Sequence, residues 1–215
     1  MRLLGFIAIV PLLWAFPSAI RTDFPSEQHH WQDTATEEIS TGRYSNCDDG
    51  YYVELPDQIV AHGAKPPSPN HGFTIDLADP RSATDVLGQK LSRYISVENN
   101  YNAAELPSLA AIVDDDLKSL EQDKSDFHVL ERASTRLDGL NATLLRLRYA
   151  EGTETISEVD IVSYRPRGPK GRGDIIYEFR LVTAEDTYSQ DKNIFDEILV
   201  GFHLTRLPLG ACSNG

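Results

Sequence analysis

Positive charge is scarce in this sequence. Its 215 residues include 20 Lys and Arg against 33 Asp and Glu, which gives a formal net charge of −13. A protein that binds DNA or RNA without sequence preference needs a basic surface to neutralise phosphates, and an anionic membrane also attracts basic segments. The composition therefore argues against nucleic-acid partners and against docking on a membrane by charge. It is typical of a soluble protein.

Long apolar runs are missing apart from Leu3–Phe16. This run follows Arg2, contains Pro11 and leads into the small residues of Pro17–Ala19, the pattern of a secretory signal. It is too short for a comfortable transmembrane helix, although an uncleaved anchor is the alternative. We predict a signal peptide over 1–19, no integral membrane segment after cleavage, and a secreted or periplasmic location.

Cysteine is limited to Cys47 and Cys212. In an oxidising compartment an even pair more often forms a disulfide than two free thiols. A bridge between them would close a long loop, for which the entropy model gives about 4–5 kcal/mol. A catalytic thiol is disfavoured because Asp48 and Asp49 beside Cys47 oppose a thiolate.

Sequence motifs for cofactors and metals are also missing. There is no phosphate-binding glycine loop, zinc-type Cys/His spacing or metalloprotease signature, so no cofactor and no metal are expected. Asp114–Asp116 lies in a predicted helix, where successive side chains point about 100° apart and cannot converge on one ion. We expect these acids to form a solvated face.

The strongest pattern that is present runs from Gly173 to Leu204. Alternating apolar residues predict a strand over 175–182, and an apolar stripe predicts a helix over 189–204 with Ser189 as its N-cap. A second helix is predicted over 106–123, capped by Asn102 or beginning just after Leu106.

Short alternating segments fill the rest of the predicted domain. Turn signals at Asp138-Gly139 and Glu151-Gly152 join strands into an antiparallel meander. Polar residues over 20–46 predict a flexible leader, and the domain is expected over 47–212. The predicted strands are 51–55, 59–62, 73–77, 94–97, 129–137, 141–149, 156–165 and 175–182.

Two stretches carry candidate binding residues. In the proline-rich segment 65–73, Asn70 and His71 precede Gly72; His71 is a candidate general base or ligand, or both side chains bond to the backbone of a tight turn. The tip between the last two strands is basic in an acidic protein, and it either grips an anionic partner or forms a solvated hairpin end. Its four basic residues are Arg165, Arg167, Lys170 and Arg172.

The end of the chain resembles the PsbP-like family. That family has a g-x-x-Y-x-l strand followed by a helix ending near s-F, and Tyr177 and Phe202 occupy those aromatic positions, with Gly201 in place of Ser. The strand at Gly50–Pro56 resembles the family's first strand. The resemblance implies an α+β fold, an antiparallel meander flanked by helices in an α/β/α sandwich. It also implies a secreted, periplasmic or lumenal protein that binds partners without catalysis.

We therefore expect a non-enzymatic binding or accessory module whose partner is a protein or a small molecule. The alternatives are a small hydrolase or lyase that uses His71 as base, and a structural envelope protein. An enzyme requires His71 to meet a second polar side chain in a pocket, whereas a binding module requires an exposed patch.

Overall fold

The structure is a computed structural model that describes residues 37–64, 72–77, 93–166 and 174–205. All described residues belong to one unit that begins at Ala35. Within these segments lie two helices, α1 (Leu109–Asp123) and α2 (Tyr188–Gly201). The strands are β1 (Glu37–Thr41), β2 (Arg43–Asn46), β3 (Tyr51–Glu54), β4 (Val60–Ala64), β5 (Gly72–Asp76), β6 (Tyr94–Tyr101), β7 (Ser125–Leu137), β8 (Leu140–Glu151), β9 (Glu154–Arg165), β10 (Ile175–Ala184) and β11 (Phe202–Leu204).

The main sheet has eight strands in the order β1-β4-β5-β6-β10-β9-β8-β7. Its strand pairs are antiparallel, and β7 to β10 pair in chain order, so the predicted meander forms. The turn at Asp138-Gly139 joins β7 to β8, with both residues at positive φ as a tight hairpin requires. A second sheet, β11-β3-β2, contains three strands.

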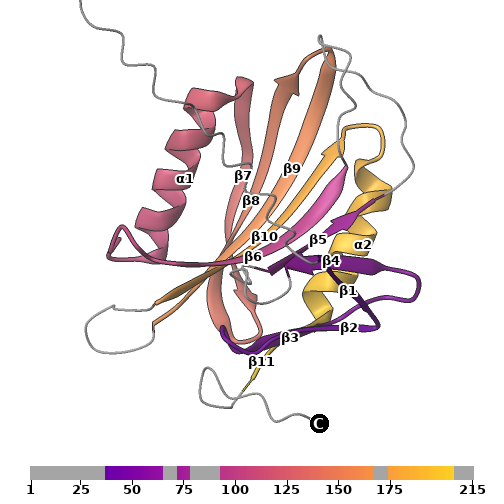
Figure 1. Ribbon diagram of the computed structural model, residues 1–215. Coiled ribbons are helices and arrows are strands. Elements are labelled where there is room, and N and C mark those ends of the chain that lie inside the picture. Colours follow the sequence, from indigo (N-terminus) through magenta and orange to yellow (C-terminus); the bar gives the residue numbers. More distant parts are fainter. Residues whose placement is uncertain (1–36, 65–71, 78–92, 167–173, 206–215) are drawn as a thin grey trace, which may run out of the picture. The chain divides into compact units, whose positions relative to one another are not determined.

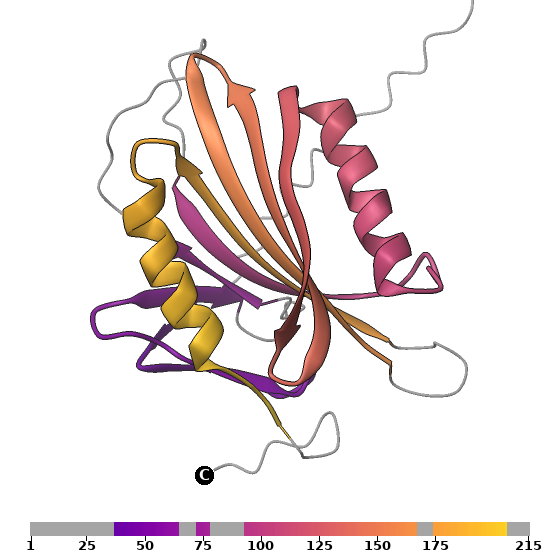
Figure 2. The same ribbon diagram turned by 180° about the vertical axis from the view of Figure 1, so that it is seen from behind.

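The two faces of the main sheet bury different apolar clusters. On β10, Tyr177 and Phe179 belong to the larger core, which also includes Phe195 and Ile198 of α2. The neighbouring Ile176 packs with the cluster beneath α1. Successive strand residues point to opposite faces, so one helix lies on each side of the sheet. Figures 1 and 2 show α1 beside β7, and α2 on the opposite side of the main sheet.

The expected fold class, an α+β protein built as an α/β/α sandwich, is wrong. The described chain is mostly antiparallel β-sheet with a small helical part. The strands β7 to β9 are long, and the α2 face also carries the three-stranded sheet. In that sheet, Phe202 pairs with Val53, and its buried ring packs against the ring of Phe179, 5.0 Å away between centroids. In an α/β/α sandwich helices cover this face of the sheet, whereas here three short strands cover part of it.

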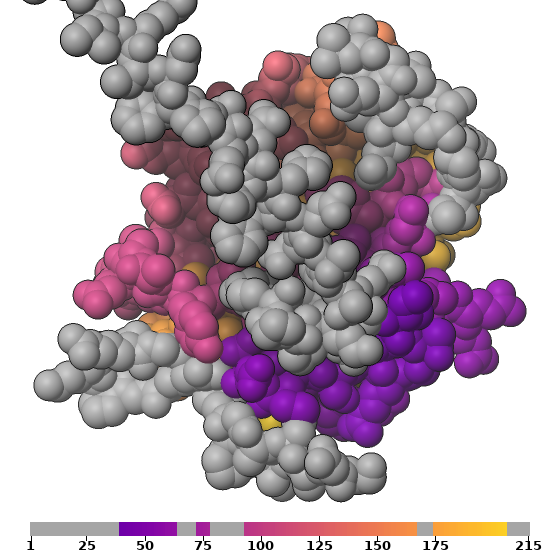
Figure 3. Space-filling view, in the orientation of Figure 1, coloured from indigo at the N-terminus to yellow at the C-terminus, as the bar shows by residue number. Residues whose placement is uncertain are grey.

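Part of the predicted leader is sheet. Strands β1 and β2 fall within 20–46, whereas residues 1–36, including the signal peptide, lie outside the described residues. In β2 only Tyr44 and Asn46 are buried, and in β1 Ile39 is exposed. Because so few apolar side chains point inward, these strands lack a readable apolar alternation. The N-terminal strands form a continuous patch at the lower right of Figure 3.

Three predicted helix boundaries are also wrong. Helix α2 ends at Gly201 because residues 202–204 form β11, and its N-cap is Thr187, not Ser189. Helix α1 begins at Leu109. Asn102 bonds instead to both backbone groups of Leu106, accepting from the N–H at 3.0 Å and donating to the carbonyl at 2.8 Å.

Candidate functional site

A hollow lined by polar and apolar groups lies between the start of α1 and the β7–β8 hairpin. Ser108 caps α1, and its Oγ accepts a hydrogen bond from the N–H of Ala111 at 3.2 Å. The hairpin turn fixes the register so that Ser134 faces Thr143 and Arg136 faces Asn141. We call the hollow the β7 groove; its volume is about 780 Å³, within the range of small-ligand sites.

The strand register determines which side chains face this groove. Arg132 pairs with Leu145, and Leu145 packs in the apolar cluster beneath α1. Directly paired residues share a face of the sheet, and residues two apart on one strand share a face as well. Arg132, Ser134 and Arg136 therefore project from β7 on the α1 side, and all three are exposed.

Both groove arginines make one modest contact. Arg132 Nη1 lies 2.6 Å from Asp114 Oδ1, but the two side chains are 40% and 63% exposed. Arg136 Nη1 donates to the carbonyl of Gly139 at 3.0 Å. Exposed ion pairs contribute only about 0–1 kcal/mol, so a ligand can displace Asp114 at little cost.

The buried face beneath α1 holds a cluster of acids around one base. Arg180 Nε lies 3.2 Å from both Glu158 Oε1 and Asp160 Oδ1, and its Nη2 bonds to Glu178. Tyr149 donates to Glu158 Oε2 at 2.7 Å. We call Glu158, Asp160, Glu178 and Arg180 the Arg180 cluster.

Burial governs the protonation of this cluster. It raises the pKa of Asp160, which the charge of Glu158 raises further, and it raises the pKa of Glu178 to about 7. Arg180 opposes both changes but is shared among the acids. Acids whose pKa is raised in this way sometimes serve as catalytic groups. Glu158 and Asp160 are only 2% exposed, however, so a substrate has no access to them in this structure.

Of the predicted binding residues, only Arg165 is described. Its Nη1 donates to the carbonyl of Gly50 at 3.5 Å and to Tyr177 Oη at 3.4 Å, at the base of the β9–β10 hairpin. Tyr177 in turn donates to the carbonyl of Asp49 at 2.7 Å. The remaining candidates, Asn70, His71, Arg167, Lys170 and Arg172, lie outside the described residues.

The structure also describes the residue that follows His71. Gly72 has φ +118°, and a Cβ there would lie 1.8 Å from the carbonyl oxygen of Val97. Only glycine fits this approach to β6.

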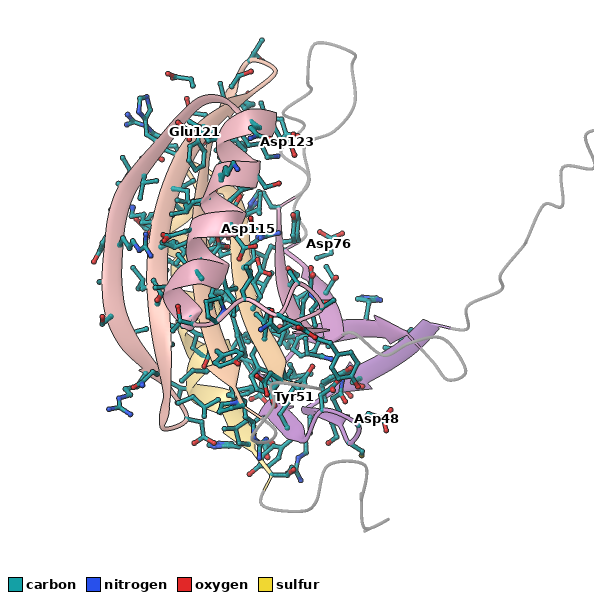
Figure 4. All side chains as sticks on the ribbon, turned by 90° about the vertical axis from the view of Figure 1, so that its left-hand side faces the viewer. Asp48, Tyr51, Asp76, Asp115, Glu121 and Asp123 are labelled. Atoms are coloured by element: carbon teal, nitrogen blue, oxygen red, sulfur yellow. The ribbon has the colours of Figure 1, made fainter. Side chains whose placement is uncertain are left out.

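The acidic triplet behaves largely as expected. Asp114 and Asp115 are exposed, whereas Asp116 is half-buried, and burial raises its pKa against the opposing charge of Arg180. Figure 4 shows Asp115 on α1 together with Glu121 and Asp123. Within the described ranges, no group of three His, Cys, Asp or Glu side chains is placed to hold a metal ion.

Sequence reasoning missed the groove residues Arg132, Ser134 and Arg136. The sequence pattern that could have indicated them is a polar residue at every second position of a predicted strand. Such a strand normally has a solvated face, so the pattern alone does not indicate a site. The pattern becomes informative only once α1 is known to lie on the same face of the sheet.

The chain is similar in fold to several solved structures. LpqN of Mycobacterium tuberculosis, described as involved in cell envelope biogenesis, matches with a TM-score of 0.54 at 12% identity, over 79% of this chain and 92% of that one. The PsbP of the cyanobacterium Synechocystis matches with a TM-score of 0.47 at 19% identity, over 84% and 99%. The Ran-binding protein Mog1p of Saccharomyces cerevisiae matches at 0.45 and 10% identity, over 78% and 96%.

The predicted PsbP-like resemblance is confirmed at the level of fold alone. No protein-family model and no curated protein matches the sequence. Of the helices in the described residues, neither α1 nor α2 is long and apolar enough to cross a bilayer.

Proposed function

We propose that this chain is a secreted or periplasmic binding or accessory protein without enzymatic activity, and that its ligand occupies the β7 groove. The supporting observation is the groove itself, an open hollow of about 780 Å³ lined by arginine, hydroxyl and amide groups. Such groups hold a ligand through hydrogen bonds. The location rests on the predicted signal at 1–19.

The burial of two acids of the Arg180 cluster supports binding over catalysis. Glu158 and Asp160 are the described acids most shielded from solvent in the Arg180 cluster, and they lie under α1 without access for a substrate. A general acid or base must reach the proton that it transfers. The basic tip from Arg165 to Arg172 remains a second predicted contact, with Arg165 fixed at its base by Tyr177 and Gly50.

A blocking substitution tests the proposal. Ser134→Trp places a large ring in the β7 groove at an exposed strand position, where it should not disturb the core. Glu131→Trp is the matched control because Glu131 pairs with Arg146 and lies on the same strand outside the groove lining.

The experiment records amide spectra of the mature protein during addition of size-fractionated extracellular and envelope extracts. We expect shifts at 132–136 and 141–143, lost in Ser134→Trp and kept in Glu131→Trp, with the ligand recovered chemically unchanged. A ligand altered by the wild type but not by His71→Ala would support the enzyme alternative instead. No shift with any fraction would support a structural role.

A further inference from the structure

The charge of the β7 groove is opposite to that of the whole chain. Its eleven lining residues include two arginines and no acid, although acids outnumber basic residues by 33 to 20 in the sequence, and Arg132 is paired at the groove edge with the exposed Asp114. A local reversal of charge is the usual feature of a surface that selects an anionic ligand.

The basic groups are arranged in a row. Arg132, Ser134 and Arg136 alternate along β7, with Thr143 opposite Ser134 and Asn141 opposite Arg136. Strand residues two apart are separated by about 7 Å, so the Cα atoms of the two arginines lie about 13 Å apart. The row therefore offers a cation at each end and hydroxyl groups in the middle.

Each arginine retains donors for a ligand. A guanidinium has five N–H donors, and the described contact of Arg136 is the one bond to the Gly139 carbonyl. Arg132 is held by an exposed pair with Asp114. A ligand carboxylate can accept two parallel bonds from either guanidinium, and such bonds are stronger than neutral hydrogen bonds.

We infer that the β7 groove binds a linear acidic oligosaccharide, with sugar hydroxyls on Ser134 and Thr143 and carboxylates on Arg132 and Arg136. This inference rests on the proposed function, because it names the ligand class of the same groove. An extended chain with an acid on each sugar fits the row of side chains. A compact anion such as free phosphate would bridge the two arginines only if both left their contacts with Asp114 and the Gly139 carbonyl.

The test uses a pure acidic oligosaccharide and an uncharged derivative of the same oligosaccharide. The full mature protein is titrated calorimetrically with a galacturonic acid oligomer of about six sugars, and separately with the same oligomer after methyl esterification, which keeps the backbone and removes the charges. The variants are Arg132→Gln and Arg136→Gln. Arg148→Gln is the control, since Arg148 is an exposed arginine of β8 that does not line the groove.

We expect the acidic oligomer to bind, the ester to bind at least about tenfold more weakly, and each groove variant to lose about tenfold in affinity. Arg148→Gln should change affinity by less than about twofold, and added salt should weaken binding. Equal affinity for acid and ester, or no binding of the acid, overturns the inference.

The two failures can be told apart. If Ser134→Trp abolishes binding of an extract component while the acidic oligomer never binds, the proposed function stands and the ligand class is wrong. If Ser134→Trp changes nothing while the acidic oligomer binds equally to wild type and to both arginine variants, the oligomer binds elsewhere and the groove is not the site.

Discussion

Arg180 of β10 faces Asp160 of β9 across the main sheet, with 3.2 Å between Nε and Oδ1. The same guanidinium also contacts Glu158 and Glu178, so three acids share one cation. One positive charge cannot balance three ionised carboxylates in a buried site. The cluster is therefore expected to hold protons near neutral pH. Its other ionisable neighbours are Asp116 of α1, Tyr94 and Glu98 of β6, and Tyr149 of β8.

The first prediction is that the protein loses stability as pH rises towards neutrality. The pKa of Glu178 is raised from 4.5 to about 7, so between these values the native state binds a proton that the unfolded state has released. The free energy of unfolding must then fall with rising pH across this window. The raised pKa values of Asp160 and Asp116 act in the same direction.

Urea denaturation from about pH 4.5 to about pH 8 measures this effect, which should be on the order of 2–3 kcal/mol. Glu178→Gln should flatten the profile because it removes one titrating group. Glu197→Gln, at an exposed position on α2, should leave the profile as it is. A wild-type stability that rises across the window would contradict the prediction.

The second prediction concerns the base of the cluster. Arg180→Met removes the only cation that contacts Glu158, Asp160 and Glu178 in the described structure. Removing one partner of a buried ionic cluster costs about 3–5 kcal/mol, and the loss should be smaller at about pH 5, where more of the acids are protonated.

Arg132→Met is the control for this substitution. It removes an exposed ion pair with Asp114 and should cost no more than about 1 kcal/mol. Thermal unfolding at the two pH values measures both variants. Equal losses in Arg180→Met and Arg132→Met would show that the cluster is not held by its shared cation.

The sequence predicted the strands of the meander because their period-2 patterns and glycine turns are local signals. It failed where long-range pairing decides the structure. Residues 202–204 continue the apolar stripe of a helix, yet they pair with β3 as β11. Tyr44 offers no local pattern, but its ring packs on Phe73 with 4.5 Å between centroids and its hydroxyl bonds to Gly72.

The β7 groove and the Arg180 cluster could not be predicted from the sequence for a related reason. Arg132, Ser134 and Arg136 read as a solvated strand face until α1 is placed beside them. Glu158 and Asp160 are acids on a predicted strand, where charged residues normally face water. Only their alignment with Arg180 on the neighbouring strand explains their burial.

The third prediction tests the packing that ends α2. A Cβ on Gly201 would lie 2.2 Å from the carbonyl oxygen of Glu54 in β3, a contact with rigid backbone. Gly201→Ala must push α2 away from the three-stranded sheet, which we expect to cost about 1–3 kcal/mol, as overpacking usually does. Asn193→Ala, at an exposed position of the same helix, should be neutral within about 0.5 kcal/mol. Equal melting temperatures for both variants would contradict this packing.

The fourth prediction is the disulfide between Cys47 and Cys212. Leu204 pairs with Tyr51, and the N–H of Thr205 donates to the carbonyl of Gly50 at 2.9 Å, so the C-terminal chain passes close to the Cys47 turn. Cys212 itself lies outside the described residues. A bridge at this point would tie β11 to β3, and its removal should cost about 2–5 kcal/mol.

Peptide mapping of the oxidised protein should recover one cross-linked peptide that contains both cysteines, and reduction should separate it. Cys47→Ser and the double variant with Cys212→Ser should lose the same stability, because either change breaks the one bridge. Two alkylatable thiols in the protein isolated under oxidising conditions would reject the pairing. So would a Cys47→Ser variant as stable as the oxidised wild type, since closing so long a loop must restrict the unfolded chain.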